Sequence, residues 1–119
     1  MVYADSDFFI ALLIPEDRHK AWAKAVYEKH KGNISTSSVT VLELLLISQR
    51  FGIGAQALIT RVLSVARLTG IQGSDALRAA YFIDNYKVGI FDAFHAALCG
   101  GKIISTDHIF GILGIDTSV

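Results

Sequence analysis

Four acidic residues occupy positions at which a carboxylate could take part in catalysis or metal binding, although they are far apart in the sequence: Asp5, Glu43, Asp92 and Asp107. Two carboxylates about 4 Å apart repel by roughly 4 kcal/mol at an effective dielectric of about 20. Several such pairs would strain a small domain, whose whole stability is roughly 5–15 kcal/mol. A divalent cation relieves this repulsion, and oxygen ligands select hard ions, Mg²⁺ or Mn²⁺. If the four residues converge, they predict a metal-assisted phosphoryl-transfer site.

Each of these acids also has an ordinary structural interpretation. Asp5 precedes and Asp92 begins an apolar helical segment, where an aspartate can simply cap the helix. Asp107, in Ser-Thr-Asp-His, fits turn chemistry. Glu43 has the weakest ordinary explanation, because the apolar segment around it offers no cation one helical turn away. His95, one turn after Asp92, is expected to be a hydrogen-bonded structural histidine.

Strands alternating with helices must position these acids. Apolar runs bounded by glycine and proline predict strands at residues 2–4, 34–37, 102–105 and 112–117, with another near residue 71. They predict helices at residues 8–14, 39–50, 58–65, 76–86 and 91–98, and one opened by Glu16 and Asp17. This alternation indicates an α/β fold, a three-layer α/β/α sandwich around a central parallel sheet. Ligands of such sheets collect beyond the carboxyl ends of the strands, so we expect Asp5 and Asp107 at one edge.

The composition favours a single domain over residues 1–119. The chain is 52% hydrophobic and 18% charged, with 11 basic and 11 acidic residues. This balance argues against a disordered tail and against sequence-blind coating of nucleic acid, which needs a basic excess. The longest apolar run, residues 8–14, is too short for a bilayer and lacks signal-peptide character, and Cys99 is the single cysteine. We therefore expect a cytoplasmic protein with no disulfide and no membrane segment.

Short motifs along the chain carry a family resemblance. They are VYADS at residues 2–6, IST at 34–36, VLEL at 41–44, FDAFHAA at 91–97 and ISTD at 104–107, followed by Phe110. In order and spacing the chain resembles the PIN-domain family, particularly the VapC-type toxins of toxin–antitoxin pairs. The most specific part is the FDAFHAA helix followed closely by the ISTD strand end, whereas residues 52–86 add only a helical pattern.

The resemblance implies a PIN-like α/β/α sandwich whose acidic pocket binds Mg²⁺ or Mn²⁺ and hydrolyses RNA as an endoribonuclease. It places the family's metal-binding and catalytic acids on Asp5, Glu43, Asp92 and Asp107. It also implies the toxin of a type II toxin–antitoxin pair, with an antitoxin as partner. The two apolar helices between residues 39 and 65 form either a homodimer face or part of the core.

Two positions depart from the family pattern. Ile109 stands where many members carry another acid, so one metal ligand is absent and a second metal is less well supported. Asp7 stands where a small polar residue is usual, and it either compensates for that loss or faces solvent.

If the pocket cuts RNA, nearby polar residues are candidates for binding it. Ser6 and Thr106 are candidates for hydrogen bonds to the scissile phosphate, although hydroxyls at strand ends are often only caps. Arg18 and Lys20, with Lys24, are candidates for contacts to the RNA backbone that salt would weaken. The ordinary interpretation of such a run is a solvated helix face.

Three other functions fit parts of the sequence. A haloacid-dehalogenase-like phosphatase would use Asp5 as nucleophile and Lys102 as its lysine, but no adjacent acid pair follows Lys102 as that site requires. A phosphoacceptor receiver domain would need an acid after a central strand, and none lies between Glu43 and Asp75. A non-catalytic PIN-like interaction module would fit the absence of an acid at Ile109.

Overall fold

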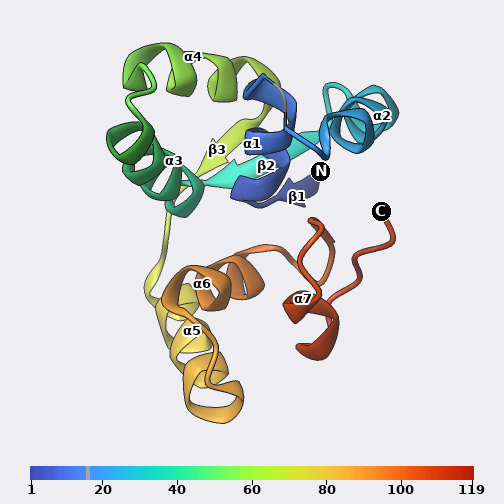
Figure 1. The fold of residues 1–119 in the computed structure, drawn as a ribbon. Coiled ribbons are helices and arrows are strands. Elements are labelled where there is room, and N and C mark those ends of the chain that lie inside the picture. The colour runs from blue at the N-terminus through green and yellow to red at the C-terminus, as the bar shows by residue number, and fades with distance from the viewer. Residues whose placement is uncertain (16) are drawn as a thin grey trace.

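The computed structural model of the chain describes residues 1–15 and 17–119. In this part of the chain the strands form a parallel sheet in the order β3-β2-β1-β4 (Figure 1). The strands are β1 (Val2–Ala4), β2 (Ile34–Ser37), β3 (Arg67–Thr69) and β4 (Ile103–Ile104). The helices are α1 (Ser6–Leu13), α2 (Lys20–His30), α3 (Ser38–Phe51), α4 (Ala55–Val65), α5 (Gly73–Tyr86), α6 (Ile90–Leu98) and α7 (Ile109–Ile112).

The sheet has β1 and β2 at its centre, and β1 pairs with both β2 and β4. Tyr3 lies opposite Ser35 on one side and opposite Ile103 on the other. Beyond the strand end, the Asp5 amide still donates to the Ile104 carbonyl at 3.3 Å. Because the strands are parallel, the residues that follow them emerge at the same edge, as the sequence predicts.

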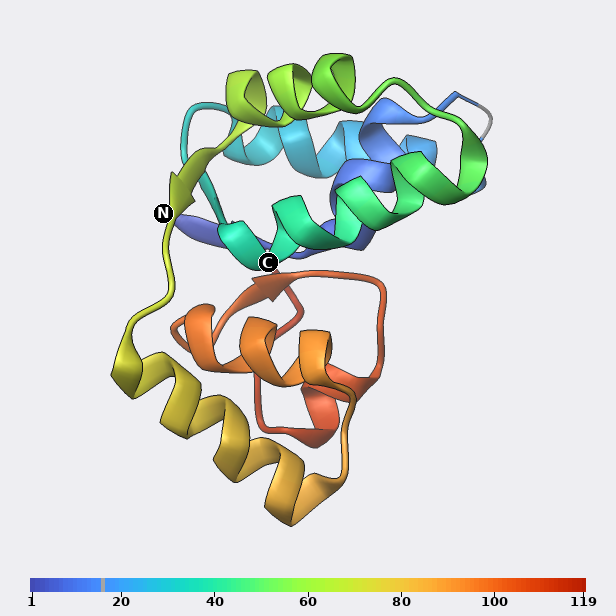
Figure 2. The same ribbon diagram turned by 90° about the vertical axis from the view of Figure 1, so that its left-hand side faces the viewer.

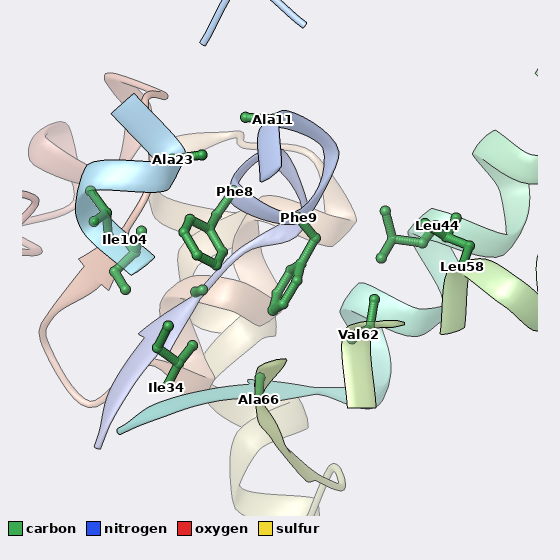
Figure 3. Packing of buried hydrophobic residues seen from close by; sticks show 12 residues of the cluster. Phe8, Phe9, Ala11, Ala23, Ile34, Leu44, Leu58, Val62, Ala66 and Ile104 are labelled. Carbon is green, nitrogen blue, oxygen red and sulfur yellow. The ribbon is translucent and has the colours of Figure 1, made fainter. Parts of the chain in front are cut away.

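Helices cover both faces of the sheet, which gives the expected three layers (Figure 2). Successive strand residues point to opposite faces. Ala4 therefore packs into a cluster with α1, α2, α3 and α4, whereas Tyr3 packs into a second cluster with α5, α6 and α7. Figure 3 shows the rings of Phe8 and Phe9 from α1 in the middle of the first cluster. Both rings are fully buried, so α1 is fixed on the sheet directly after Asp5.

Several helix boundaries follow the local chemistry of the sequence. Ile14 is extended at the C-terminal end of α1, as expected for a residue before Pro15. Ser37 caps α3 by accepting a hydrogen bond from the Val39 amide at 3.2 Å. Gly52 ends α3 in a left-handed conformation with φ of 66°, which glycine adopts without steric cost.

Other boundaries differ from the sequence prediction. Helix α2 begins at Lys20, because Asp17 instead accepts a hydrogen bond from the His19 amide in a turn; Glu16 lies outside the described residues. Strand β3 ends at Thr69, before the predicted position near residue 71. The predicted strand at residues 112–117 is wrong: the short helix α7 extends to Ile112, and only Asp116 forms an isolated bridge, with Lys102.

None of the helices in the described residues has the length and apolar character needed to cross a membrane.

Candidate active site

Asp5 is a buried carboxyl group at the junction of β1 and α1. Its side chain caps α1 by accepting a hydrogen bond from the Asp7 amide at 3.2 Å, so the capping interpretation is confirmed. The residue is only 5% exposed. Burial, together with the neighbouring Asp7 carboxyl, raises the pKa of Asp5 well above its ordinary value. Burial therefore disfavours the charged form of Asp5 unless a positive charge lies beside it.

Asp7 does not simply face solvent, because one of its oxygens holds the strand end of β4. Its Oδ2 accepts hydrogen bonds from Ser105 Oγ at 3.2 Å, from the Thr106 amide at 3.0 Å and from Thr106 Oγ1 at 2.8 Å. Its Oδ1 is buried without a hydrogen-bond partner. An unpaired buried carboxylate oxygen is costly, so this atom is available to a ligand.

Asp107 follows β4 in a tight turn at the same edge. Its amide donates to Ser105 Oγ at 3.0 Å, and its Oδ1 accepts from the Ile109 amide at 3.0 Å. The turn interpretation is therefore confirmed. The side chain is exposed. Its Oδ1 accepts the turn hydrogen bond, and no hydrogen bond from the described residues reaches its Oδ2.

Asp92 brings α6 into the acidic group. The prediction that Asp92 could be a plain N-cap is wrong, because α6 begins at Ile90 with Gly89 as its cap residue. Burial, and then the negative charges of Asp107 and Glu43, raise the pKa of Asp92 above its ordinary value. Glu43, Asp107 and Asp7 therefore lie within electrostatic reach of Asp92, whereas Asp5 is linked to this group through its neighbour Asp7.

Glu43 has a partner that sequence reasoning missed. Its Oε1 is paired with His95 Nε2, which comes from a helix 52 positions away. His95 is buried, and its other ring nitrogen lies 2.7 Å from the hydroxyl oxygen of Tyr3. The expectation of a hydrogen-bonded histidine is confirmed. The signal was present in Glu43 itself, a carboxylate on an apolar face that required a partner from another element.

The predicted RNA-binding residues divide into two groups. Ser6 is the first residue of α1, beside Asp5, and Thr106 is held by Asp7 at the same edge. Lys20 instead donates to the Leu12 carbonyl at 2.9 Å, and Arg18 is exposed and bonded to the neighbouring His19. Leu12 lies about 9 Å along α1 from Ser6, at a rise of 1.5 Å per residue. The structure therefore does not bring these two cations to the acids.

Arg50 is a cation that sequence reasoning did not connect with the acids. It lines a hollow of about 180 Å³ together with Glu43, Leu46, Ile47 and Phe91. Glu43, Ile47 and Arg50 follow the helical spacing that places side chains on one face of α3. This hollow gives the acidic group an adjacent positive charge.

A divalent cation fits the donor chemistry of this group. The candidate ligands are carboxylate oxygens, the donors that Mg²⁺ and Mn²⁺ prefer. As the side chains stand in the described residues, no three acidic, histidine or cysteine side chains lie close enough to hold one ion. The unpaired Asp7 Oδ1 and the raised pKa of Asp5 are nevertheless features that a cation would relieve. Lys102 lies before β4, at the opposite end of that strand from the acids, and so does not support a phosphatase site.

The fold of the chain has counterparts among solved structures. The chain resembles the structure of VapC20 from Mycobacterium tuberculosis, described as a toxin that cleaves the sarcin–ricin loop, with a TM-score of 0.84, 19% identity and 98% of both chains covered. It also resembles a toxin–antitoxin complex from Klebsiella pneumoniae, with a TM-score of 0.71, 20% identity, and 91% of this chain and 88% of that chain covered. No curated protein matches the sequence. The PIN domain family matches residues 2–111, and the chain therefore belongs to that family.

Proposed function

We propose that this PIN domain is a Mg²⁺- or Mn²⁺-dependent endoribonuclease. The observation that supports it most is that Asp92 of α6 lies near Asp107 and Glu43, acids from two other parts of the fold, whose charges together with burial raise the pKa of Asp92. Among the described residues, no lysine or arginine lies within ion-pair distance of these carboxylates. A divalent cation would relieve this concentration of negative charge, and phosphodiester hydrolysis is the chemistry that an acidic metal pocket serves.

Each acid has a role in this proposal. Asp5 and Asp92 are the principal ligands, while Glu43 and Asp107 complete the ligand set directly or through water. When bound, the ion would polarise a phosphate oxygen and lower the pKa of a water molecule. Ser6 would donate its hydroxyl proton to the scissile phosphate, whereas the Thr106 hydroxyl, which donates to Asp7, would have to leave that bond to do the same. Water attacks the phosphorus while the bond from phosphorus to the 3′-oxygen breaks. One product then carries a 5′-phosphate and the other a 3′-hydroxyl.

The test compares Asp92→Asn with wild type on RNA in Mg²⁺, in Mn²⁺ and in EDTA. A sarcin–ricin loop hairpin serves as one substrate, since the similar VapC20 structure is described as cleaving it, and total cellular RNA as another. We expect wild-type cleavage to need the metal, and Asp92→Asn to cleave at least about 100-fold more slowly. The matched control is Asp84→Asn, an exposed aspartate on α5, which should cleave as fast as wild type.

A second measurement separates this proposal from a non-catalytic interaction module. Titration calorimetry of wild type with Mn²⁺ should give a binding signal that Asp92→Asn weakens. If wild type binds no Mn²⁺, or if Asp92→Asn cleaves RNA at the wild-type rate in Mg²⁺, the nuclease assignment fails.

We also propose that the protein is the toxin of a type II toxin–antitoxin pair and acts in the cytoplasm. Both structures described above come from toxin systems, and one of them is a toxin–antitoxin complex. The proposal predicts a small open reading frame beside this gene whose product binds the chain. Co-expression of that product should suppress RNA cleavage.

A further inference from the structure

A chain of hydrogen bonds through the core ends on Glu43. The Val39 amide donates to Ser37 Oγ at 3.2 Å, and Ser37 Oγ lies 2.7 Å from the Tyr3 hydroxyl oxygen. Tyr3 in turn lies 2.7 Å from His95 Nδ1, and His95 Nε2 is bonded to Glu43 Oε1. The chain starts at the N-terminal end of α3, passes through β1 and α6, and returns to α3 at Glu43.

One direction of these bonds satisfies every partner when the His95 ring is neutral. The Glu43 carboxylate only accepts, so the neutral ring donates from Nε2, and its Nδ1 then accepts the Tyr3 hydroxyl proton. Tyr3 can accept in turn from Ser37, so each side chain donates once and every donor points toward Glu43. Burial raises the pKa of Tyr3, so its hydroxyl keeps the proton that this direction requires. Hydrogen bonds aligned in one direction strengthen one another in a low-dielectric interior.

The two carboxylate oxygens of Glu43 differ in their hydrogen bonding. Oε1 is committed to His95, while no hydrogen bond from the described residues reaches Oε2. The Glu43 side chain is 19% exposed, whereas Tyr3, Ser37 and His95 are all buried. The network is therefore buried except at Glu43, the one member whose side chain is partly exposed. The charges of Glu43 and His95 both act on the pKa of Asp92, so this pair adjoins the acidic group.

We propose that His95, held by Tyr3, is a positioning residue that fixes the Glu43 carboxylate and leaves Oε2 free for the divalent cation. This inference rests on the proposed function. A glutamate side chain without such support would have to be ordered when the ion binds, at an entropic cost. Partners that orient a metal-binding side chain typically change metal affinity by about 10- to 100-fold when removed.

Mn²⁺ affinity of the full-length chain, measured by calorimetry without RNA, tests this role. We expect His95→Leu to weaken Mn²⁺ binding by about 10- to 100-fold and Tyr3→Phe by at least about threefold. His95→Gln keeps an amide donor close to the position of Nε2 and should bind better than His95→Leu. The matched control is Ser48→Ala on α3, the helix that carries Glu43. It removes a buried hydroxyl that donates to the Leu45 carbonyl at 2.8 Å. It should lower the melting temperature and leave Mn²⁺ affinity unchanged.

A double mutant shows whether His95 acts through Glu43. If it does, His95→Leu should cost no further affinity in a Glu43→Gln background. The inference is overturned if folded His95→Leu and Tyr3→Phe bind Mn²⁺ like wild type, or if the two losses add in full. Should His95→Leu fail to fold, His95→Gln and Tyr3→Phe decide the matter by the same criteria. A wild-type chain that neither binds Mn²⁺ nor cleaves RNA overturns the proposed function itself, which distinguishes the two failures.

Discussion

Asp92 and Asp5 are carboxyl groups that the fold keeps partly or wholly out of water beside other acids. Burial raises the pKa of both, and neighbouring negative charge adds to the effect. Asp92 also lies in the first turn of α6, where the helix dipole favours a negative charge. The raised pKa means that desolvation and repulsion outweigh this dipole in the metal-free protein.

The stability of the metal-free protein should therefore depend on pH through these groups. An acid whose pKa is raised by folding contributes stability that is complete below its unfolded value, about 4, and is lost as the pH rises through the folded value. Asparagine resembles the neutral acid, so Asp92→Asn should melt at a higher temperature than wild type at about pH 7. This advantage should shrink toward about pH 4.

Thermal unfolding in EDTA across this pH range measures the effect. Asp84→Asn, on the exposed surface of α5, should show no pH-dependent gain over wild type. Addition of Mg²⁺ should remove the advantage of Asp92→Asn, because the ion stabilises the ionised carboxylate. A variant that is less stable than wild type at neutral pH in EDTA would contradict the electrostatic account of this site.

Sequence reasoning predicted which acids lie at the strand ends but could not supply all their partners. Asp5 and Asp107 follow strands that are recognisable from apolar runs, so their shared edge was predictable from parallel-sheet geometry. The pairing of Glu43 with His95 joins positions 52 apart on two helices. It depends on how α3 and α6 pack, which no local pattern encodes. The role of Asp7 in holding Thr106 was hidden for the same reason.

At the scale of elements, errors occur where a segment lacks an apolar signature. Strand β3 is exposed at all of its residues and lies at the edge of the sheet, so it shows no alternation of buried and exposed positions. Helix α7 has only four residues, too few for a helical period to be visible. Helices with a buried stripe, such as α1 and α6, were placed to within two residues.

Helix α3 combines an acid and a cation along one face, and this arrangement predicts a separate role for Arg50. If RNA crosses the hollow that Arg50 shares with Glu43, the guanidinium group should contact a phosphate. Arg50→Ala should then raise KM for RNA by about 3- to 10-fold with little change in kcat. The salt dependence of binding should also fall by about one unit of slope.

Steady-state cleavage at several salt concentrations measures both quantities for Arg50→Ala. The control is Arg61→Ala, which removes an exposed arginine from α4. Equal KM values for wild type and Arg50→Ala would mean that RNA does not cross this hollow. A loss confined to kcat would instead indicate that Arg50 acts on the acids.

At the scale of the whole molecule, the helices α3 and α4 pack into the core on one side and expose apolar side chains on the other. Leu44, Leu58 and Val62 are buried in the first cluster, so these helices are part of the core. Their outer surfaces still expose large apolar side chains: Leu42, Leu46, Phe51 and Leu63. Apolar patches of this kind on a small domain are typical of interaction surfaces. The net charge of zero means that two copies do not repel one another.

Phe51 is the residue that best tests whether this surface forms the predicted homodimer. It is 67% exposed and lines a hollow of about 400 Å³ with Ile10, Ile14, Ile47 and Ile53. Burying such a ring between two copies would remove it from water, whereas an aspartate there would carry an unpaired charge into the interface.

Light scattering should give wild type twice the chain mass of 12.9 kDa and Phe51→Asp the mass of one chain. Leu77→Asp, on α5 in the opposite layer and 76% exposed in wild type, should remain dimeric. A monomeric wild-type chain, or a dimeric Phe51→Asp, would exclude this face as the homodimer contact.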